Sequence, residues 1–118
     1  MEFRNVIAII RPDRLENVEQ ALQVLTVPGI SVSKVKGYGE YRDFYVRDWM
    51  SGYVRIEIFA PQEQARAIAE AIMDASHTGL PGDGIVAIQP VETVFHIESR
   101  SVLTSGSGSD PNSREQGA

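Results

Sequence analysis

The sequence predicts an α+β fold in which two β-α-β halves build one four-stranded antiparallel sheet, with both helices on one face. Two apolar, β-branched runs of strand length are each followed by a proline and then by an amphipathic stretch, which indicates the repeated β-α unit. The chain of 118 residues is the size of one small domain. Its hydrophobic content of 42% is enough for a packed core.

The first half begins with the apolar run 3–10, which has the length and composition of a central strand. Pro12 stops this strand and suits the first turn of a helix, where its missing N–H costs nothing. Apolar residues then recur on one helical face at Leu15, Val18, Leu22 and Leu25. Pro28-Gly29 is expected to end the helix, and residues 30–38 are expected to form the second strand.

The second half opens with residues 40–53, which are charged and aromatic without a clear period and predict a loop excursion. Apolar residues at 54, 56 and 58 alternate with charged ones, which indicates a half-buried strand. Pro61 is expected to start the second helix, whose buried face would carry Ala65, Ile68, Ala69 and Ile72. Residues 84–89 predict a fourth strand, and residues 94–97 a short fifth.

This order of elements is the ferredoxin-like βαββαβ architecture. Because both helices cover the same side of its sheet, the opposite side would expose apolar surface, and we expect the domain to oligomerise through it. Residues 104–118 contain no large apolar side chain and are expected to form a disordered tail. The folded domain is therefore expected to span residues 1–103.

Composition excludes several classes of function. Eleven Lys and Arg against 16 Asp and Glu give a net charge of −5, which argues against nucleic-acid and anionic-membrane partners. The absence of cysteine excludes disulfides, thiolate metal sites and a cysteine nucleophile. Two histidines are too few to predict a metal site, and no nucleophile–base pair predicts an enzyme. The N-terminus lacks the features of a signal peptide and no run is long enough to insert into a membrane, so we expect a cytoplasmic protein.

Four stretches, in this order and spacing, resemble the PII signal-transduction family over residues 1–99. They are residues 9–12 (IIRP), 29–39 (GISVSKVKGYG), 54–58 (VRIEI) and 78–84 (TGLPGDG). The resemblance implies a homotrimer that binds adenine nucleotides in the clefts between subunits and performs no catalysis. It also implies that residues 40–53 are the T-loop, which contacts a regulated protein, and that residues 78–85 are the B-loop, which contacts phosphate.

The resemblance assigns individual residues to the nucleotide. Backbone N–H groups of a glycine-rich loop can hold phosphates, and the matching positions are Gly82, Asp83 and Gly84. The other matching nucleotide-binding positions are Ser31, Gly37, Tyr38, Gly39, Phe59 and His96. Aromatic residues and arginines are frequent interface anchors, and the T-loop offers Tyr41, Arg42, Phe44, Tyr45, Arg47 and Trp49 for a partner protein.

This sequence departs from the nitrogen-regulating members at the charged positions of the site. Glu40 and Tyr41 stand where those members have an Arg-Gln pair, and Tyr53 stands where they have the T-loop lysine. Ile85 replaces the B-loop lysine, and His96 and Glu98 replace two C-terminal arginines. A triphosphate needs several cations or magnesium. We therefore expect ADP or AMP to be favoured over ATP, and 2-oxoglutarate to lose its ligands.

The pattern looks like the divergent PII-like group associated with carboxysomes and bicarbonate transport. That likeness implies bicarbonate as a further regulatory ligand and a transporter or carboxysome component as the partner. Two alternatives stay open, namely a nitrogen regulator that senses ATP and ADP, and a trimeric interaction scaffold that has lost ligand sensing. Several motifs also have a purely structural interpretation. Residues 78–84 alone would suit an ordinary helix-ending loop, His96 an ordinary strand position, and the T-loop aromatics local packing.

Overall fold

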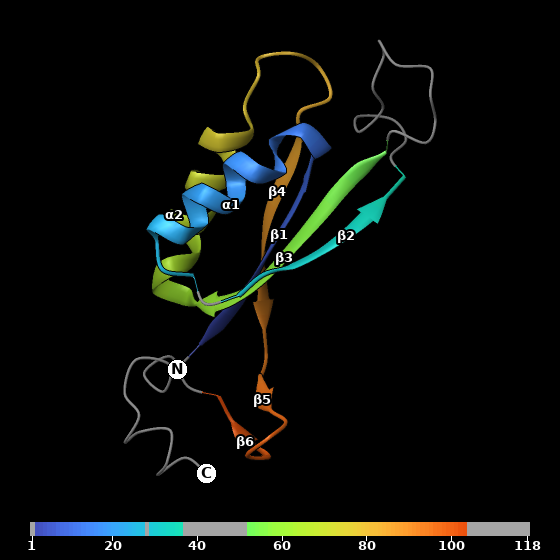
Figure 1. Ribbon diagram of the computed structural model, residues 1–118. Coiled ribbons are helices and arrows are strands. Elements are labelled where there is room, and N and C mark those ends of the chain that lie inside the picture. The colour runs from blue at the N-terminus through green and yellow to red at the C-terminus, as the bar shows by residue number, and fades with distance from the viewer. Residues whose placement is uncertain (1, 28, 37–51, 104–118) are drawn as a thin grey trace.

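The structure is a computed structural model, and it describes residues 2–27, 29–36 and 52–103. The strands and helices follow one another along the chain as shown in Figure 1. They are β1 (Phe3–Ile10), a 3-10 helix η1 (Pro12–Arg14), α1 (Leu15–Val24), β2 (Ser31–Val35), β3 (Tyr53–Pro61), α2 (Gln62–Ser76), β4 (Gly84–Val91), β5 (Phe95–His96) and β6 (Ser101–Val102).

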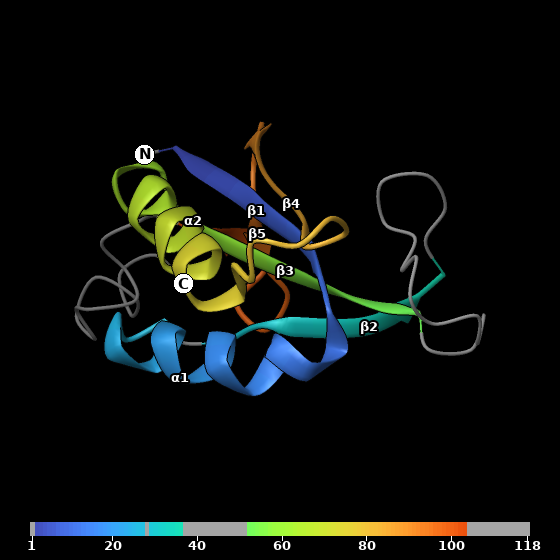
Figure 2. The ribbon, with the colours of Figure 1, turned by 90° about the horizontal axis from the view of Figure 1, so that it is seen from above.

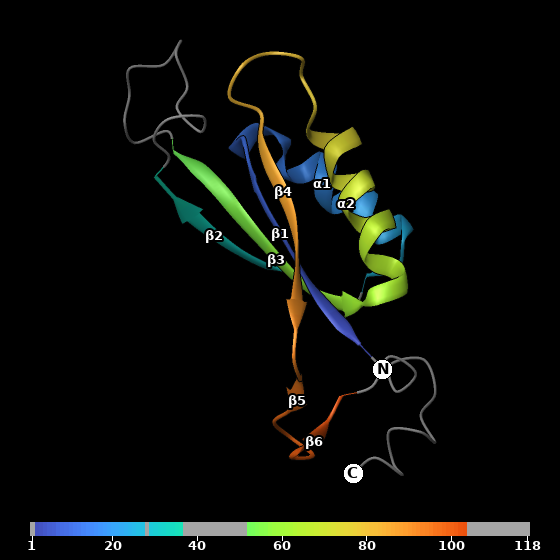
Figure 3. The same cartoon turned by 180° about the vertical axis from the view of Figure 1, so that it is seen from behind.

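One four-stranded sheet in the order β2-β3-β1-β4 organises the domain, and every neighbouring pair in it is antiparallel. Helices α1 and α2 lie together on one face of this sheet, as Figure 2 shows from above. In Figure 3 the sheet is seen from behind, and within the described residues no helix covers that face, here called the open face. The predicted ferredoxin-like fold is thereby confirmed.

Strand alternation places the core between the sheet and the helices. Val6, Ala8 and Ile10 of β1 lie opposite Ile58, Ile56 and Val54 of β3, and all six are buried. They pack against buried residues of the two helices, which are Val18, Leu22, Ala65, Ile68, Ala69 and Ile72. The buried face predicted for α2 is therefore confirmed in full.

Helix α1 ends earlier than its apolar pattern predicts, and Leu25 follows its last turn with 37% of its surface exposed. The cause is a Schellman motif. The N–H of Val27 donates to the Leu22 carbonyl at 3.2 Å, and the N–H of Thr26 donates to the Gln23 carbonyl at 3.0 Å. Thr26 adopts the left-handed conformation that this motif requires, with φ of 55°. The helix therefore stops before it reaches Pro28-Gly29.

Two further boundaries differ from the expectation. Pro61 completes β3, where it pairs with Phe3, and α2 begins only at Gln62. The predicted short fifth strand is one arm of a hairpin, because β5 pairs with β6, which the sequence did not predict. The connecting turn is closed by the N–H of Arg100, which donates to the His96 carbonyl at 2.8 Å.

A row of polar side chains crosses the open face. Asn5 donates to Glu57 at 2.9 Å and to Gln89 at 3.5 Å, and Arg55 pairs with Glu57 at 3.3 Å. Arg55 and Glu57 lie two residues apart on the same strand, β3. The buried Oδ1 of Asn5 has no hydrogen-bond partner within the described chain.

Residues 40–51 of the predicted T-loop and the whole predicted tail, residues 104–118, lie outside the described residues. In the part that is described, no helix is long and apolar enough to cross a membrane.

Candidate functional site

The loop that joins α2 to β4, residues 77–83, lies at the end of the sheet where β1 stops and β3 starts (Figure 1). Pairing fixes this arrangement, because Ile10 at the end of β1 lies opposite Gly84 of β4 on one side and Val54 of β3 on the other. Sequence resemblance predicted a phosphate-binding B-loop here.

The carboxylate of Asp83 organises the loop from within. It accepts hydrogen bonds from the backbone N–H of Thr78 at 2.8 Å, from the N–H of Gly79 at 3.1 Å and from the Thr78 hydroxyl. Arg11 Nε, from the residue after β1, donates to its Oδ1 at 3.1 Å. The carboxylate is thus turned into the loop and surrounded by donors, whereas the resemblance assigned only the backbone N–H of this residue to a phosphate.

This surrounding sets the acidity of Asp83. Partial burial alone would raise the pKa of its carboxyl, but the hydrogen bonds from Thr78, Arg11 and Gly79 outweigh burial and hold the pKa far below its usual range. The side chain therefore stays ionised at every pH at which the protein would function. Its charge is compensated locally, so the loop does not present an unpaired anion.

Two glycines of the loop and the glycine that starts β4 adopt conformations that other residues rarely reach, with φ of 83° at Gly79, 91° at Gly82 and 108° at Gly84. Pro81 and Gly82 occupy the centre of a turn in the order typical of type II, with proline first and glycine second. Gly84 is required for space as well, because a Cβ there would lie 1.8 Å from the carbonyl oxygen of Ile9. The glycine pattern thus has a local structural cause, whatever the loop binds.

Two side chains from outside the loop donate to consecutive carbonyls within it. Arg11 donates through an Nη to the Pro81 carbonyl at 2.5 Å, and the hydroxyl of Tyr53 donates to the Gly82 carbonyl at 2.8 Å. Sequence reasoning did not assign either residue to this loop, and it placed Thr78 in the loop without giving its side chain a role. Arg11-Pro12 was interpreted only as the end of a strand, and Tyr53 only as the residue that replaces the T-loop lysine of the nitrogen-regulating members.

The other predicted nucleotide residues are not gathered at this loop within one chain. Ser31 is exposed, and Phe59, with 50% of its surface exposed, follows Val54 by five residues along β3. Five residues of strand span roughly 17 Å. Phe59 is therefore well separated from Gly84, which starts β4 at the level of Val54.

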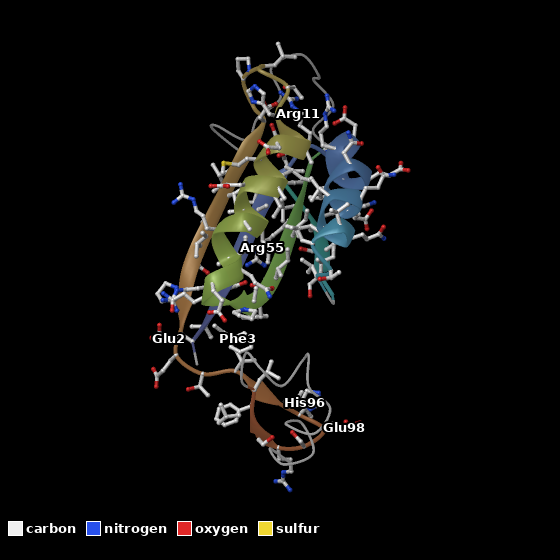
Figure 4. All side chains as sticks on the ribbon, turned by 90° about the vertical axis from the view of Figure 1, so that its left-hand side faces the viewer. Glu2, Phe3, Arg11, Arg55, His96 and Glu98 are labelled. Atoms are coloured by element: carbon white, nitrogen blue, oxygen red, sulfur yellow. The ribbon has the colours of Figure 1, made fainter. Side chains whose placement is uncertain are left out.

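His96 lies still further away, in the hairpin that follows β4. Figure 4 shows Arg11 at one end of the molecule and His96 at the other, with Glu98 close to His96. Ile85, where the resemblance places a lysine, pairs with Ile9 and is 38% exposed on the open face. One chain therefore divides the predicted nucleotide residues between opposite ends of the sheet.

The remaining predicted site residues lie outside the described part of the chain. These are Gly37, Tyr38 and Gly39 for the nucleotide, and Tyr41, Arg42, Phe44, Tyr45, Arg47 and Trp49 for the partner. Among the residues that are described, no group of three or more His, Asp or Glu side chains could hold a metal ion.

Comparison with known proteins shows which class this fold and loop define. The family model of nitrogen regulatory protein P-II matches residues 3–101. The chain is 36% identical over 105 residues to nitrogen regulatory protein P-II of Cereibacter sphaeroides, and the match covers 82% of this chain and 93% of that protein. The P-II protein of Rhizobium meliloti is 35% identical with the same coverage.

A solved structure agrees with these matches. The crystal structure of Arabidopsis thaliana PII bound to citrate aligns with a TM-score of 0.72 and 28% sequence identity, over 86% of this chain and 85% of that one. The ferredoxin-like domain is thus of the signal-transduction class. The chain belongs to the P-II family, as the resemblance implied.

Proposed function

We propose that this P-II protein is a nucleotide-responsive regulator that binds ADP or AMP more tightly than ATP. The observation that carries the proposal is the loop at residues 77–83. Its acidic side chain and two of its carbonyls already accept hydrogen bonds from within the chain. The guanidinium of Arg11 donates to the Asp83 carboxylate and to the Pro81 carbonyl. Backbone N–H groups can hold one or two phosphates. A third phosphate would lack a cation at position 85, because Ile85 stands where the resemblance to the nitrogen-regulating members places a lysine.

The nucleotide would occupy clefts between the subunits of a homotrimer. The separation of Gly82, Asp83 and Gly84 from Phe59 within one chain supports this arrangement, because a nucleotide needs both its phosphate and its adenosine held together. Apposed copies could bring the loop of one chain to the Phe59 and Ser31 of another. The open face of the sheet offers the apolar and polar surface for such contacts.

Regulation would follow if the nucleotide favours one conformation of residues 40–53 over another, since a ligand shifts an equilibrium only by its differential affinity. The aromatic and arginine content of that segment suits a protein partner. On the likeness to the inorganic-carbon group, the partner would be a transporter or carboxysome component, with bicarbonate as a second ligand. The nucleotides act here as regulatory ligands, and the proposal requires no cofactor and no catalysis.

Isothermal titration calorimetry with AMP, ADP and ATP, each with and without magnesium and bicarbonate, tests the proposal. We expect ADP or AMP to bind more tightly than ATP in every condition. Tighter binding of ATP, strengthened by 2-oxoglutarate, would instead identify a nitrogen regulator. Light scattering on the same samples should give the mass of a trimer.

An interaction scaffold without ligand sensing is the second candidate. It is favoured by the apolar side chains at Ile85, Phe95 and Ile97 and by the departures at the charged positions. A ligand that binds only the folded state raises the melting temperature. A scaffold would therefore show no thermal shift with any of the three nucleotides.

A further inference from the structure

Tyr53 connects the start of β3 to the loop that precedes β4. Its hydroxyl donates to the Gly82 carbonyl at 2.8 Å, and only 4% of its surface is exposed. Because β1 lies between β3 and β4 in the sheet, the side chain reaches past the end of β1 to make this contact. A buried ring with its hydroxyl on a backbone carbonyl is a rigid support, since few rotamers are open to it.

Arg11 is the second support, and the two act on neighbouring peptides. Arg11 donates a hydrogen bond to the Pro81 carbonyl at 2.5 Å, and Tyr53 donates one to the Gly82 carbonyl. In a trans peptide the C=O and the following N–H point in opposite directions. The N–H of Gly82 therefore points away from the guanidinium that holds the Pro81 carbonyl.

This orientation matters for an anion. A phosphate is bound by N–H groups and repelled by carbonyl oxygens, so a phosphate loop must turn its carbonyls aside. Here Arg11 and Tyr53 donate to two carbonyls, and the carboxylate of Asp83 accepts hydrogen bonds from Thr78, Gly79 and Arg11. Without its hydroxyl, Tyr53 would release the Gly82 carbonyl, and the glycine would be free to rotate that oxygen toward the bound phosphate.

We propose that Tyr53 is a positioning residue of the phosphate loop, whose hydroxyl keeps the Gly82 carbonyl away from the anion. The inference rests on the proposed nucleotide function and adds a specific residue to it. Tyr53 does not touch the nucleotide in this scheme. It acts only on the part of the binding that depends on phosphate, and one hydrogen bond of this kind corresponds to about a fivefold change in affinity.

The test compares Tyr53→Phe with the wild-type full-length chain by calorimetry, using adenosine, AMP and ADP as ligands. Phenylalanine keeps the buried ring and removes only the hydroxyl. Ile72→Val is the matched control, because it destabilises the fully buried core on α2 by a similar amount without touching the loop. Hydrogen–deuterium exchange of the peptide covering residues 77–84 supplies a second readout that needs no ligand.

We expect Tyr53→Phe to weaken AMP and ADP about fivefold, to leave adenosine unchanged and to speed exchange in the loop. Ile72→Val should leave the ratio of ADP to adenosine affinity as it is in the wild type. An equal loss for all three ligands, or an unchanged ratio, would overturn the positioning role while the wild-type binding still supported the proposed function. A wild-type protein that binds no nucleotide would overturn both.

Discussion

Arg11 Nε donates to Asp83 Oδ1 at 3.1 Å and so ties the residue after β1 to the loop ahead of β4, 72 positions later in the chain. Both side chains are largely shielded from water, with 13% and 23% of their surfaces exposed. This pair compensates the charge of the Asp83 carboxylate through a contact between residues far apart in the sequence. The Asp83 carboxylate accepts hydrogen bonds from backbone N–H groups of the loop, and Arg11 donates to the same carboxylate.

Asp83→Asn should lower the free energy of unfolding by about 2 kcal/mol, because the amide offers one acceptor oxygen and no charge to four donors. The pKa of the folded-state carboxyl is lowered, so its stabilisation is fully present above the unfolded-state pKa of about 3.9 and is lost as the pH falls toward the lower folded-state value. The difference between wild type and variant should therefore be constant from about pH 8 to pH 5 and shrink only below about pH 4. Urea denaturation at each pH measures it.

Two controls isolate this effect. Glu63→Gln makes the same change of charge in the exposed first turn of α2 and should alter stability by less than about 0.5 kcal/mol. His77 Nδ1 lies 3.8 Å from Asp83 Oδ2, so the series is repeated in a His77→Gln background, which removes this contact. A stability difference that disappears between pH 8 and pH 5 in that background would contradict the assignment.

Gly84→Ala should be among the most destabilising small substitutions in the chain, at about 3 kcal/mol or more. Its Cβ would lie 1.8 Å from the Ile9 carbonyl oxygen, so β4 would have to separate from β1 at its first residue. Gly79→Ala is the control. It has a positive φ of 83°, but the nearest atom to its Cβ is His77 Nε2 at 3.9 Å, so only about 1 kcal/mol of backbone strain is expected. Similar losses for both variants would show that conformation alone, and not space, makes Gly84 necessary.

Thr26→Gly should stabilise the protein. Thr26 holds the left-handed position of the Schellman motif after α1, where a β-branched residue costs about 1–2 kcal/mol relative to glycine. Part of that gain is offset by the entropy of the unfolded glycine and by the bond from the Thr26 hydroxyl to the Leu25 carbonyl. We expect the free energy of unfolding, measured by differential scanning calorimetry, to increase by about 0.5 kcal/mol. An unchanged or lower melting temperature would mean that the hydroxyl contact outweighs the backbone strain.

Mixing two binding-deficient variants should restore nucleotide binding if the site is shared between subunits. Gly82→Val would distort the loop, whose φ of 91° at this position disfavours a branched side chain. Phe59→Ala would remove an exposed apolar contact on β3. After refolding an equal mixture, about a quarter of the clefts would pair an intact loop with an intact Phe59. Calorimetry on the mixture measures the recovered sites, and their complete absence would contradict a shared site.

The fold was largely predictable because its signals are local. The alternation in β3 and the apolar face of α2 follow from side-chain periodicity, and β1 follows from the length and composition of its apolar run. The described structure confirms all three. The end of α1 was not predictable in the same way, since a threonine stands in the position that glycine usually marks. The β5–β6 hairpin was missed because two-residue strands leave no period in the sequence.

The site was predictable only as a set of loop positions. The glycines of residues 78–84 indicated an unusual backbone, whereas the contacts of Arg11 and Tyr53 join residues far apart in the chain. No spacing rule connects such residues, because strand order brings them together. The nucleotide roles of Ser31, Phe59, Gly82, Asp83, Gly84 and His96 stay predictions.

The close approach of Gly84 to the Ile9 carbonyl fixes more than a turn. It determines which residue of β4 begins the pairing with β1, and a slip of one residue would exchange Ile85 on the open face for Val86 beneath the helices. The hairpin that carries His96 follows β4 after three residues, so the register of β4 also determines where the hairpin lies. An insertion or deletion just after Gly84 should therefore change which face each later residue of β4 occupies, whereas a change in the preceding loop would leave that register as it is.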